Sequence, residues 1–104
     1  MHDEFSSVTE STVYKNVGCT ICLCLVTNDE IICANAGDSR CVMAKGGKAI
    51  NMSEDHKPEC EIERKRIEDA GGMVEDNRVN GILNLSRSFG DYEYKLNSKL
   101  KADE

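Results

Sequence analysis

The fold of this chain is decided by the stretch IICANAGDSR at residues 31–40, where an apolar run ends in a glycine and an aspartate. Residues 31–34 predict a strand, and the short continuous apolar run at 21–26 predicts another, buried on both faces. Between them, the sequence TNDE at 27–30 predicts a hairpin turn, since Asn and Asp tolerate a left-handed backbone. The hairpin is therefore expected to place Asp38 at the end of a strand.

Two further strands are expected after this turn, at 41–44 and 49–52, with Gly46-Gly47 as the two-residue turn between them. Two successive hairpins predict an antiparallel meander. A weaker strand pattern follows at Met73-Val74, with a turn at Asp76-Asn77.

One helix is expected at residues 59–70, because Pro58 suits a first helical turn and Gly71-Gly72 ends the pattern. Eight of the eleven residues from 59 to 69 are charged, and the apolar stripe is narrow. The helix is therefore predicted to lie at the surface. Around these elements we expect an N-terminal arm at 1–16, one domain at 17–96 and a polar tail at 97–104.

Composition excludes several classes of protein. With 104 residues, 39% of them hydrophobic, the chain suits one small folded domain, and its net charge of −6 argues against nucleic-acid and anionic-membrane surfaces. No run approaches the roughly 20 apolar residues of a membrane helix, and the first residues do not resemble a signal peptide. We therefore expect a cytoplasmic location, with the nucleus as an alternative.

The six cysteines are expected to be free, buried thiols rather than disulfides, because most lie in or beside apolar runs. Cys19 and Cys22 have the spacing of a zinc knuckle, but no second pair completes four ligands. A thiol-based metal or redox protein using these two residues is the least favoured functional hypothesis.

Three aspartates are candidate ligands for a hard divalent cation. Asp38 follows a strand within Gly-Asp-Ser-Arg, Asp55 precedes a histidine, and Asp91 follows Gly90. Carboxylate oxygens suit Mn²⁺ or Mg²⁺. Each of the three also has a simpler interpretation as a cap or turn residue, because short acidic side chains are common at such positions.

Two basic residues are further candidates for the site. His56, beside Asp55, could transfer protons, although a loop histidine more often clasps neighbouring structure. Arg87 could bind a substrate phosphate, or could instead pair with a carboxylate such as Asp91 or Asp38. The structural role is the simpler interpretation for both residues.

Seven motifs in a fixed order make the pattern specific, although each is weak alone. Along the chain they are Gly-x-Thr at 18–20, ANAGDSR at 34–40, a Gly-Gly turn at 46–47, DHKP at 55–58, a charged helix ending in AGG at 70–72, RVNG at 78–81 and LNLSRSFGD at 83–91. In this order they resemble the middle of the catalytic domain of the metal-dependent type 2C serine/threonine protein phosphatases. The end of the chain is most similar to the family's gamma-like branch.

The resemblance implies an α+β fold, part of a two-sheet antiparallel β-sandwich with one charged flanking helix. It also implies hydrolysis of phosphoserine or phosphothreonine in a phosphoprotein substrate, with Mn²⁺ or Mg²⁺ as cofactor. Asp38 would contribute to an additional, weaker metal site, and the helix at 59–70 would lie beside the cleft. Several metal ligands of the family belong to segments that these residues do not match.

Two functional hypotheses therefore lead. One is a phosphatase in abbreviated form, with a cleft assembled from Asp38, Asp55, Asp91 and a second subunit. The other is a catalytically inactive fragment or phosphoprotein-binding module of the same family. Unpaired strand edges predict a homodimer, with exchanged strands as one form of it.

Overall fold

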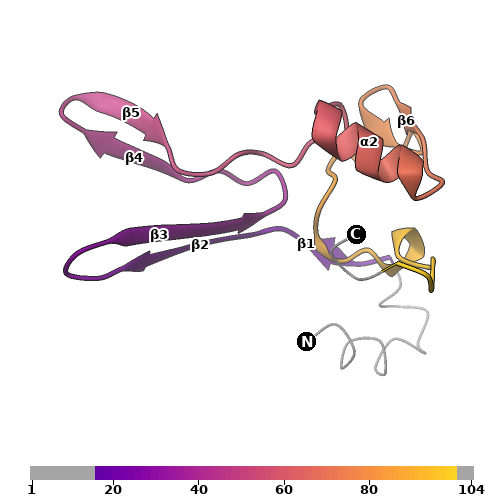
Figure 1. The fold of residues 1–104 in the computed structure, drawn as a ribbon, viewed down its shortest axis with the longest axis horizontal. Helices are drawn as coiled ribbons and strands as arrows, with labels where there is room; N and C mark the ends of the chain where they lie inside the picture. The colour runs from indigo at the N-terminus through magenta and orange to yellow at the C-terminus, as the bar shows by residue number, and fades with distance from the viewer. Residues whose placement is uncertain (1–15, 101–104) are drawn as a thin grey trace.

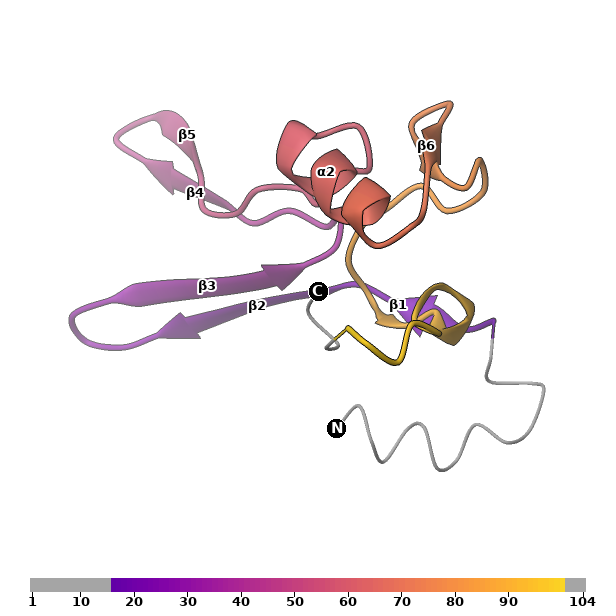
Figure 2. The ribbon, with the colours of Figure 1, turned by 45° about the vertical axis from the view of Figure 1, so that its right-hand side comes forward.

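The computed structural model describes residues 16–100, which form antiparallel strand pairs and one α-helix (Figure 1). In both views two long hairpins project to one side, while the helix and a smaller hairpin lie at the other (Figure 2). The elements are β1 (Gly18–Cys19), β2 (Ile21–Val26), β3 (Ile31–Ala36), β4 (Val42–Lys45), β5 (Lys48–Asn51), α2 (Glu61–Asp69), β6 (Val74–Glu75), β7 (Arg78–Val79), β8 (Phe89–Gly90) and the 3₁₀ helix η1 (Tyr92–Tyr94).

The first hairpin pairs β2 with β3 along their full length, from Ile21 opposite Ala36 to Val26 opposite Ile31. Its turn forms where the sequence predicts, but for another reason. The hydroxyl of Thr27 accepts the backbone N–H groups of Asp29 and Glu30 at 3.3 and 3.0 Å. Neither Asn28 nor Asp29 has a positive φ, so a threonine side chain stabilises this turn instead of a left-handed backbone.

The second hairpin pairs β4 with β5 through the predicted Gly46-Gly47 turn. Both glycines have positive φ, +58° and +74°, as the twist-matched two-residue turn requires. The predicted meander is wrong, because among the described strands β3 pairs only with β2 and β4 only with β5. The chain between β3 and β4 is instead hydrogen-bonded to the loop that follows β5, where Met52 and His56 donate their N–H groups to the carbonyls of Cys41 and Gly37.

The hydrophobic core is small. Ile67 of α2 and Val79 of β7 are each 8% exposed, and Pro58 is fully buried. The prediction that β2 is buried on both faces is wrong, since Leu23 is 57% exposed and Leu25 59%. The radius of gyration of 15.8 Å exceeds the roughly 13 Å of a compact chain of this size, because the long hairpins extend away from the core.

The surface helix is confirmed, although it begins at Glu61 instead of at residue 59. Pro58 lies in a preceding turn, in which the N–H of Cys60 donates to the carbonyl of Lys57 at 3.1 Å. The helix ends as predicted, with Gly71 at φ +91°. Ile67 faces the core, whereas Ile62 on the opposite side is 80% exposed.

Two small sheets complete the described fold. β6 and β7 join through the predicted turn at Asp76-Asn77, where φ is +51° and +59°. β1 pairs with β8, so that Gly18 lies opposite Gly90 and the two ends of the described segment come together. The described strands thus form four separate two-stranded sheets, and a β-sandwich is not confirmed.

The predicted arm at 1–16 lies outside the described residues except for Asn16, as do residues 101–104 of the predicted tail. Within the described part, no helix is long and apolar enough to cross a membrane. All six cysteines are free, as expected. None of them is buried, which corrects the prediction of buried thiols.

Candidate functional site

Two loops that the sequence singled out meet at the root of the long hairpins. The loop after β3 contains Gly37, and the loop after β5 contains His56. The N–H of Gly37 donates to Nδ1 of His56 at 2.9 Å, and the N–H of His56 donates to the carbonyl of Gly37 at 2.9 Å. These reciprocal bonds hold together residues that are 19 positions apart.

Gly37 is required at this point because its backbone has φ +122° and no room for a side chain. A Cβ there would lie 2.3 Å from Cγ2 of Thr20, far inside the contact distance of two carbons. Thr20 also shares a 2.6 Å hydrogen bond with the hydroxyl of Ser39. The threonine of the Gly-x-Thr motif therefore packs against the Gly-Asp-Ser-Arg motif.

Further bonds attach a third motif to this centre. The N–H of Ser86 donates to the carbonyl of His56 at 3.1 Å. Asn35 donates from Nδ2 to the carbonyls of Gly37 and Glu54, at 3.1 and 3.0 Å. Motifs from residues 20, 34–40, 53–58 and 86–87 thus converge on one loop junction, which we call the Gly37–His56 junction.

Asp38 points from this junction toward Lys57. Nζ of Lys57 donates a hydrogen bond to Oδ2 of Asp38 at 2.7 Å, and the two groups form an ion pair. The side chain of Asp38 is 23% exposed and that of Lys57 is 32% exposed. The hydrogen bond to Asp38 raises the pKa of Lys57 above its usual value. Lys57 is a partner that the sequence analysis did not assign to the site, although it stands within the DHKP motif.

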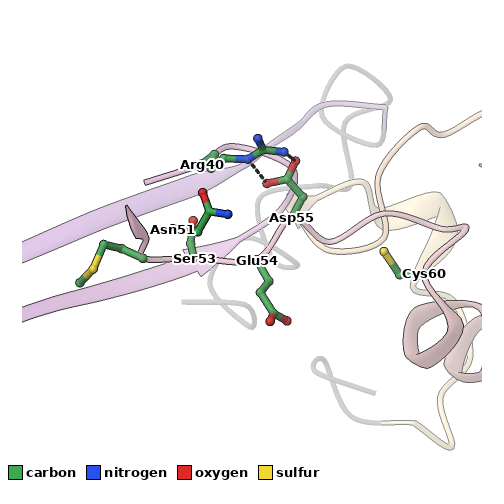
Figure 3. Close-up of a pocket in the computed structure, with 7 residues that line it drawn as sticks. Arg40, Asn51, Ser53, Glu54, Asp55 and Cys60 are labelled. Atoms are coloured by element: carbon green, nitrogen blue, oxygen red, sulfur yellow. Dashed lines mark hydrogen bonds and ion pairs between the residues drawn. The ribbon is translucent and has the colours of Figure 1, made fainter. Parts of the chain in front are cut away.

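Asp55 is held by Arg40 through two bonds, of 3.0 Å from Nε and 2.8 Å from the terminal nitrogen. The hydrogen bond from Arg40 holds the pKa of the Asp55 carboxyl below its usual range. This pair closes one side of an open pocket (Figure 3). The other residues that line the pocket are Asn51, Met52, Ser53, Glu54 and Cys60.

Arg87 binds a carboxylate that the sequence analysis did not consider, that of Glu63 on α2. Its Nε and terminal nitrogen lie 3.1 and 3.0 Å from one Glu63 oxygen. Arg66 donates to the other oxygen at 2.9 Å and also to the carbonyl of Ser86. Glu63 is 5% exposed. Burial by itself would raise the pKa of Glu63, but the hydrogen bonds from Arg87 and Arg66 outweigh it and lower the pKa to about 2.

Asp91 lies at the β1–β8 sheet, directly after Gly90. It has a left-handed backbone with φ +49°, and its N–H donates to the carbonyl of Val17 at 2.9 Å. A Cβ on Gly18 would lie 2.2 Å from Oδ2 of Asp91, so the carboxylate covers that glycine. Asp91 therefore organises the strand pairing.

The three candidate aspartates do not form one group. Among residues 16–100, no three carboxylate or histidine ligand atoms lie close enough together to hold a cation. Asp38 and Asp55 each have a basic partner, Lys57 and Arg40. By themselves the described residues do not make a complete Mn²⁺ or Mg²⁺ site, and Asp38 could contribute one ligand to such a site.

In this structure His56 has the structural role that the sequence analysis preferred, because it holds the neighbouring loops together through hydrogen bonds. Because Nδ1 accepts a backbone hydrogen bond, the junction holds the imidazole with Nδ1 unprotonated, and only Nε2 is left for other contacts. Sequence reasoning did not identify Glu63. A lone glutamate in a run of charged helix residues carries no signal that distinguishes a buried partner from a solvated one.

Comparison with known proteins gives a consistent result. The family model described as protein phosphatase 2C matches residues 1–102. Protein phosphatase ppm-1.G of Caenorhabditis elegans is 59% identical over 90 residues, covering 86% of this chain and 18% of that protein. Human protein phosphatase 1G is 54% identical over 88 residues, covering 84% of this chain and 16% of that protein.

A solved structure is similar as well. The phosphatase from Toxoplasma gondii superposes with a TM-score of 0.65 and 44% sequence identity, over 68% of this chain and 23% of that one.

The relatives are longer than this chain. The probable protein phosphatase 2C 21 of Arabidopsis thaliana is 43% identical over 103 residues, which is 27% of its own length. The chain thus spans between about a seventh and a quarter of the curated relatives it matches.

The contact between Gly37 and Thr20 can be tested by substitution. Gly71 also has a positive φ, but nothing lies within 4 Å of the position that a Cβ would take, so Gly71→Ala is a matched control for backbone strain alone. Gly71→Ala should cost about 1–2 kcal/mol of unfolding free energy. Gly37→Ala should cost about 1–3 kcal/mol more because of the overlap with Thr20. Urea unfolding followed by circular dichroism measures both, and equal costs would contradict the contact.

The buried carboxylate of Glu63 should make stability depend on acidic pH. Its pKa is about 2 in the folded state against 4.5 for an unperturbed glutamate, so its stabilisation is present above pH 4.5 and is lost as the pH falls toward 2. We expect a loss on the order of 2 kcal/mol, reduced because the two arginines are partly exposed and screened.

Unfolding free energies of wild type, Glu63→Gln and Glu61→Gln between about pH 5 and pH 2 test this expectation. Glu61 is an exposed glutamate on the same helix. Glu63→Gln should flatten the pH dependence, whereas Glu61→Gln should keep the wild-type slope. The same slope in all three proteins would show that Glu63 is not paired as described.

Proposed function

Because this chain belongs to the protein phosphatase 2C family, we propose that it forms part of the catalytic domain of a serine/threonine protein phosphatase. The reaction is hydrolysis of phosphoserine or phosphothreonine in a phosphoprotein. The relatives named ppm-1.G and protein phosphatase 1G agree with the gamma-like branch expected from the sequence. The chain covers only part of those proteins, so this activity is proposed of the whole protein to which such a domain belongs.

The main structural observation that supports the phosphatase proposal is the position of Asp38. Gly37 and His56 hold the loop at the end of β3, and Asp38 extends from it with one oxygen on Lys57. A carboxylate that is fixed in place and only 23% exposed can bind a cation without a large loss of side-chain entropy. Such pre-positioning is what a site for a hard cation requires.

A bound Mn²⁺ or Mg²⁺ would lower the pKa of a water molecule and neutralise charge on the phosphate. We propose that Asp38 supplies one ligand oxygen to this cofactor. Asp55 and Asp91 are weaker candidates, since Asp55 would have to release Arg40 and Asp91 lies at the β1–β8 sheet.

For His56 and Arg87 the geometry supports positioning roles better than direct chemistry. His56 uses Nδ1 to hold Gly37, and Arg87 uses its guanidinium to hold Glu63. Through these contacts, His56 fixes the loop that carries Asp38, and Arg87 fixes the 86–87 segment against α2. A catalytic role for His56 and a phosphate contact for Arg87 are the alternative proposals.

The role of Asp38 predicts a specific pattern of activity. In the whole protein to which this domain belongs, phosphate release from a phosphothreonine peptide should depend on added Mn²⁺. Asp38→Asn should lower the Mn²⁺-dependent rate by tenfold or more, roughly the loss expected when charge stabilisation is removed. The measurement is phosphate release with and without Mn²⁺, at equal protein concentration.

Lys57→Gln is the matched control, because it breaks the same ion pair but keeps the carboxylate. If Asp38 serves only as the partner of Lys57, the two variants should behave alike. If Asp38 binds the cation, only Asp38→Asn should lose the Mn²⁺ dependence. Equal loss in both variants would contradict the metal role.

The second candidate function is a phosphoprotein-binding or catalytically inactive module. It is favoured by one observation, that Asp38, Asp55 and Glu63 all have basic partners and that no carboxylate group assembles in the described residues. Background rates in every arm of the assay, together with binding of a phosphothreonine peptide in preference to its unphosphorylated form, would support this alternative.

Assembly is a further part of the proposal. Each described sheet has two strands, so every strand has an unpaired edge, and Leu23, Leu25 and Val26 are exposed on β2. Such edges favour pairing with another chain. We therefore propose a homodimer, with strand exchange as one form of it, that completes the two-sheet sandwich.

Light scattering tests the dimer directly. The expected mass at micromolar protein concentration is twice the 11.5 kDa of the chain. Leu25→Lys on β2 should shift the mass toward the monomer, since charged edges oppose strand pairing. A monomeric mass for the wild-type chain would contradict the proposal.

The proposed location is the cytoplasm, with the nucleus as the alternative. All six cysteines are free thiols, and free thiols suit a reducing compartment.

A further inference from the structure

Three cysteines meet between the two long hairpins, away from the Gly37–His56 junction. Cys24 on β2 lies directly opposite Cys33 on β3, and Cys41 immediately precedes β4. The Sγ atoms of Cys24 and Cys41 are 3.1 Å apart, and the three sulfurs all lie within 4.8 Å of one another. We call this the thiol cluster. It is the one group of three potential ligands that the described residues bring together.

The backbone holds the thiol cluster in place. Directly opposite residues of an antiparallel pair place their side chains on the same face, which fixes Cys24 beside Cys33. Cys41 is held separately, because its N–H donates to the hydroxyl of Ser53 at 2.9 Å and its carbonyl accepts the N–H of Met52 at 2.9 Å. No large rearrangement is needed to bring the sulfurs to a common centre.

The ligand chemistry differs from that of Asp38. Thiolates are soft ligands and select zinc and similar ions over Mn²⁺ or Mg²⁺. With Zn–S bonds of about 2.3 Å, the sulfurs of a tetrahedral site lie about 3.8 Å apart. The Cys24–Cys41 separation of 3.1 Å is shorter than this value and no sulfur pair exceeds 4.8 Å, so a small outward movement of the 3.1 Å contact would accommodate an ion.

A simple core role for these thiols fits the structure less well. Cys24 is exposed, and Cys33 and Cys41 are only partly buried, so an ion in solution can reach the cluster. A disulfide is not formed, since all three thiols are free and the Sγ atoms of Cys24 and Cys41 remain well beyond the roughly 2.05 Å of an S–S bond.

We propose that Cys24, Cys33 and Cys41 bind one thiophilic divalent cation of the Zn²⁺ class through three thiolates, with water in the fourth position. The ion would link the β2–β3 hairpin to the start of β4. Because Gly37 and Asp38 lie between Cys33 and Cys41, the ion would also close the chain around the loop that carries Asp38. Binding of this kind stabilises the folded state, because the unfolded chain holds no preformed site.

Co²⁺ provides a direct test as a spectroscopic substitute for Zn²⁺. Titration of the reduced chain with Co²⁺ should give thiolate-to-metal charge-transfer absorption of an intensity that corresponds to three thiolates and saturates at one equivalent. Zn²⁺ should displace it. Cys24→Ser, Cys33→Ser and Cys41→Ser should each weaken binding by more than the roughly 10- to 100-fold that loss of an outer-shell partner costs.

Cys19→Ser and Cys60→Ser are matched controls, because both cysteines are exposed and lie outside the cluster. Both should keep the wild-type spectrum and affinity. Absence of charge-transfer absorption in the wild-type chain, or equal effects of all five substitutions, would overturn the proposal.

A second measurement needs no variant and so does not depend on the folding of mutants. In the wild-type chain, Zn²⁺ should slow alkylation of Cys24, Cys33 and Cys41, read by mass spectrometry, and leave Cys19 and Cys60 reactive. Uniform protection, or none, would count against the cluster. Asp38→Asn should leave both measurements unchanged, so that failure of the phosphatase proposal and failure of this one can be told apart.

Discussion

The structure depends on the reciprocal hydrogen bonds between Gly37 and His56. They satisfy backbone groups at a junction where four motifs meet, and an unsatisfied polar group there would cost free energy. The approach is possible only because residue 37 has no side chain, since Thr20 occupies the space that a Cβ would need. A neutral imidazole is the complementary requirement, because a protonated Nδ1 could not accept the N–H of Gly37.

Charge is distributed around this junction in local pairs. Although the chain has a net charge of −6, Asp38, Asp55 and Glu63 are each matched by lysine or arginine. The pairs differ in kind. Glu63 is buried and anchors α2 to the 86–87 segment, whereas Asp38 keeps partial access to solvent. The degree of burial therefore distinguishes the carboxylate that is enclosed within the fold from the one that solvent can reach.

The long hairpins also bring together three thiols, in a cluster separate from the Gly37–His56 junction. In the sequence, Cys33 and Cys41 flank the loop after β3, which contains Asp38, and both cysteines belong to the thiol cluster. The small core of Ile67 and Val79 contributes little to holding the hairpins together. Links between hairpins, through the loop junction and the thiol cluster, therefore have more influence on this fold than they would in a domain with a large core.

The sequence alone determined the local elements and their turns. Gly46-Gly47, Asp76-Asn77 and Gly71 adopt the positive φ values that their residue types favour, and these preferences act within a few positions of the chain. The motif order also led to the correct family. The predictions that β2 is buried and that the hairpins form a meander were wrong, because apolar composition does not reveal which faces and strand edges find a partner.

Only the tertiary structure decided the partners of the candidate site residues. Asp38 with Lys57, Gly37 with His56 and Thr20 with Ser39 are each 19 positions apart, and Glu63 with Arg87 are 24 apart. Which of 13 basic residues would neutralise a given carboxylate depends on how the two loops cross. That crossing follows from packing and hydrogen bonding between distant segments, and no preference of neighbouring residues encodes it.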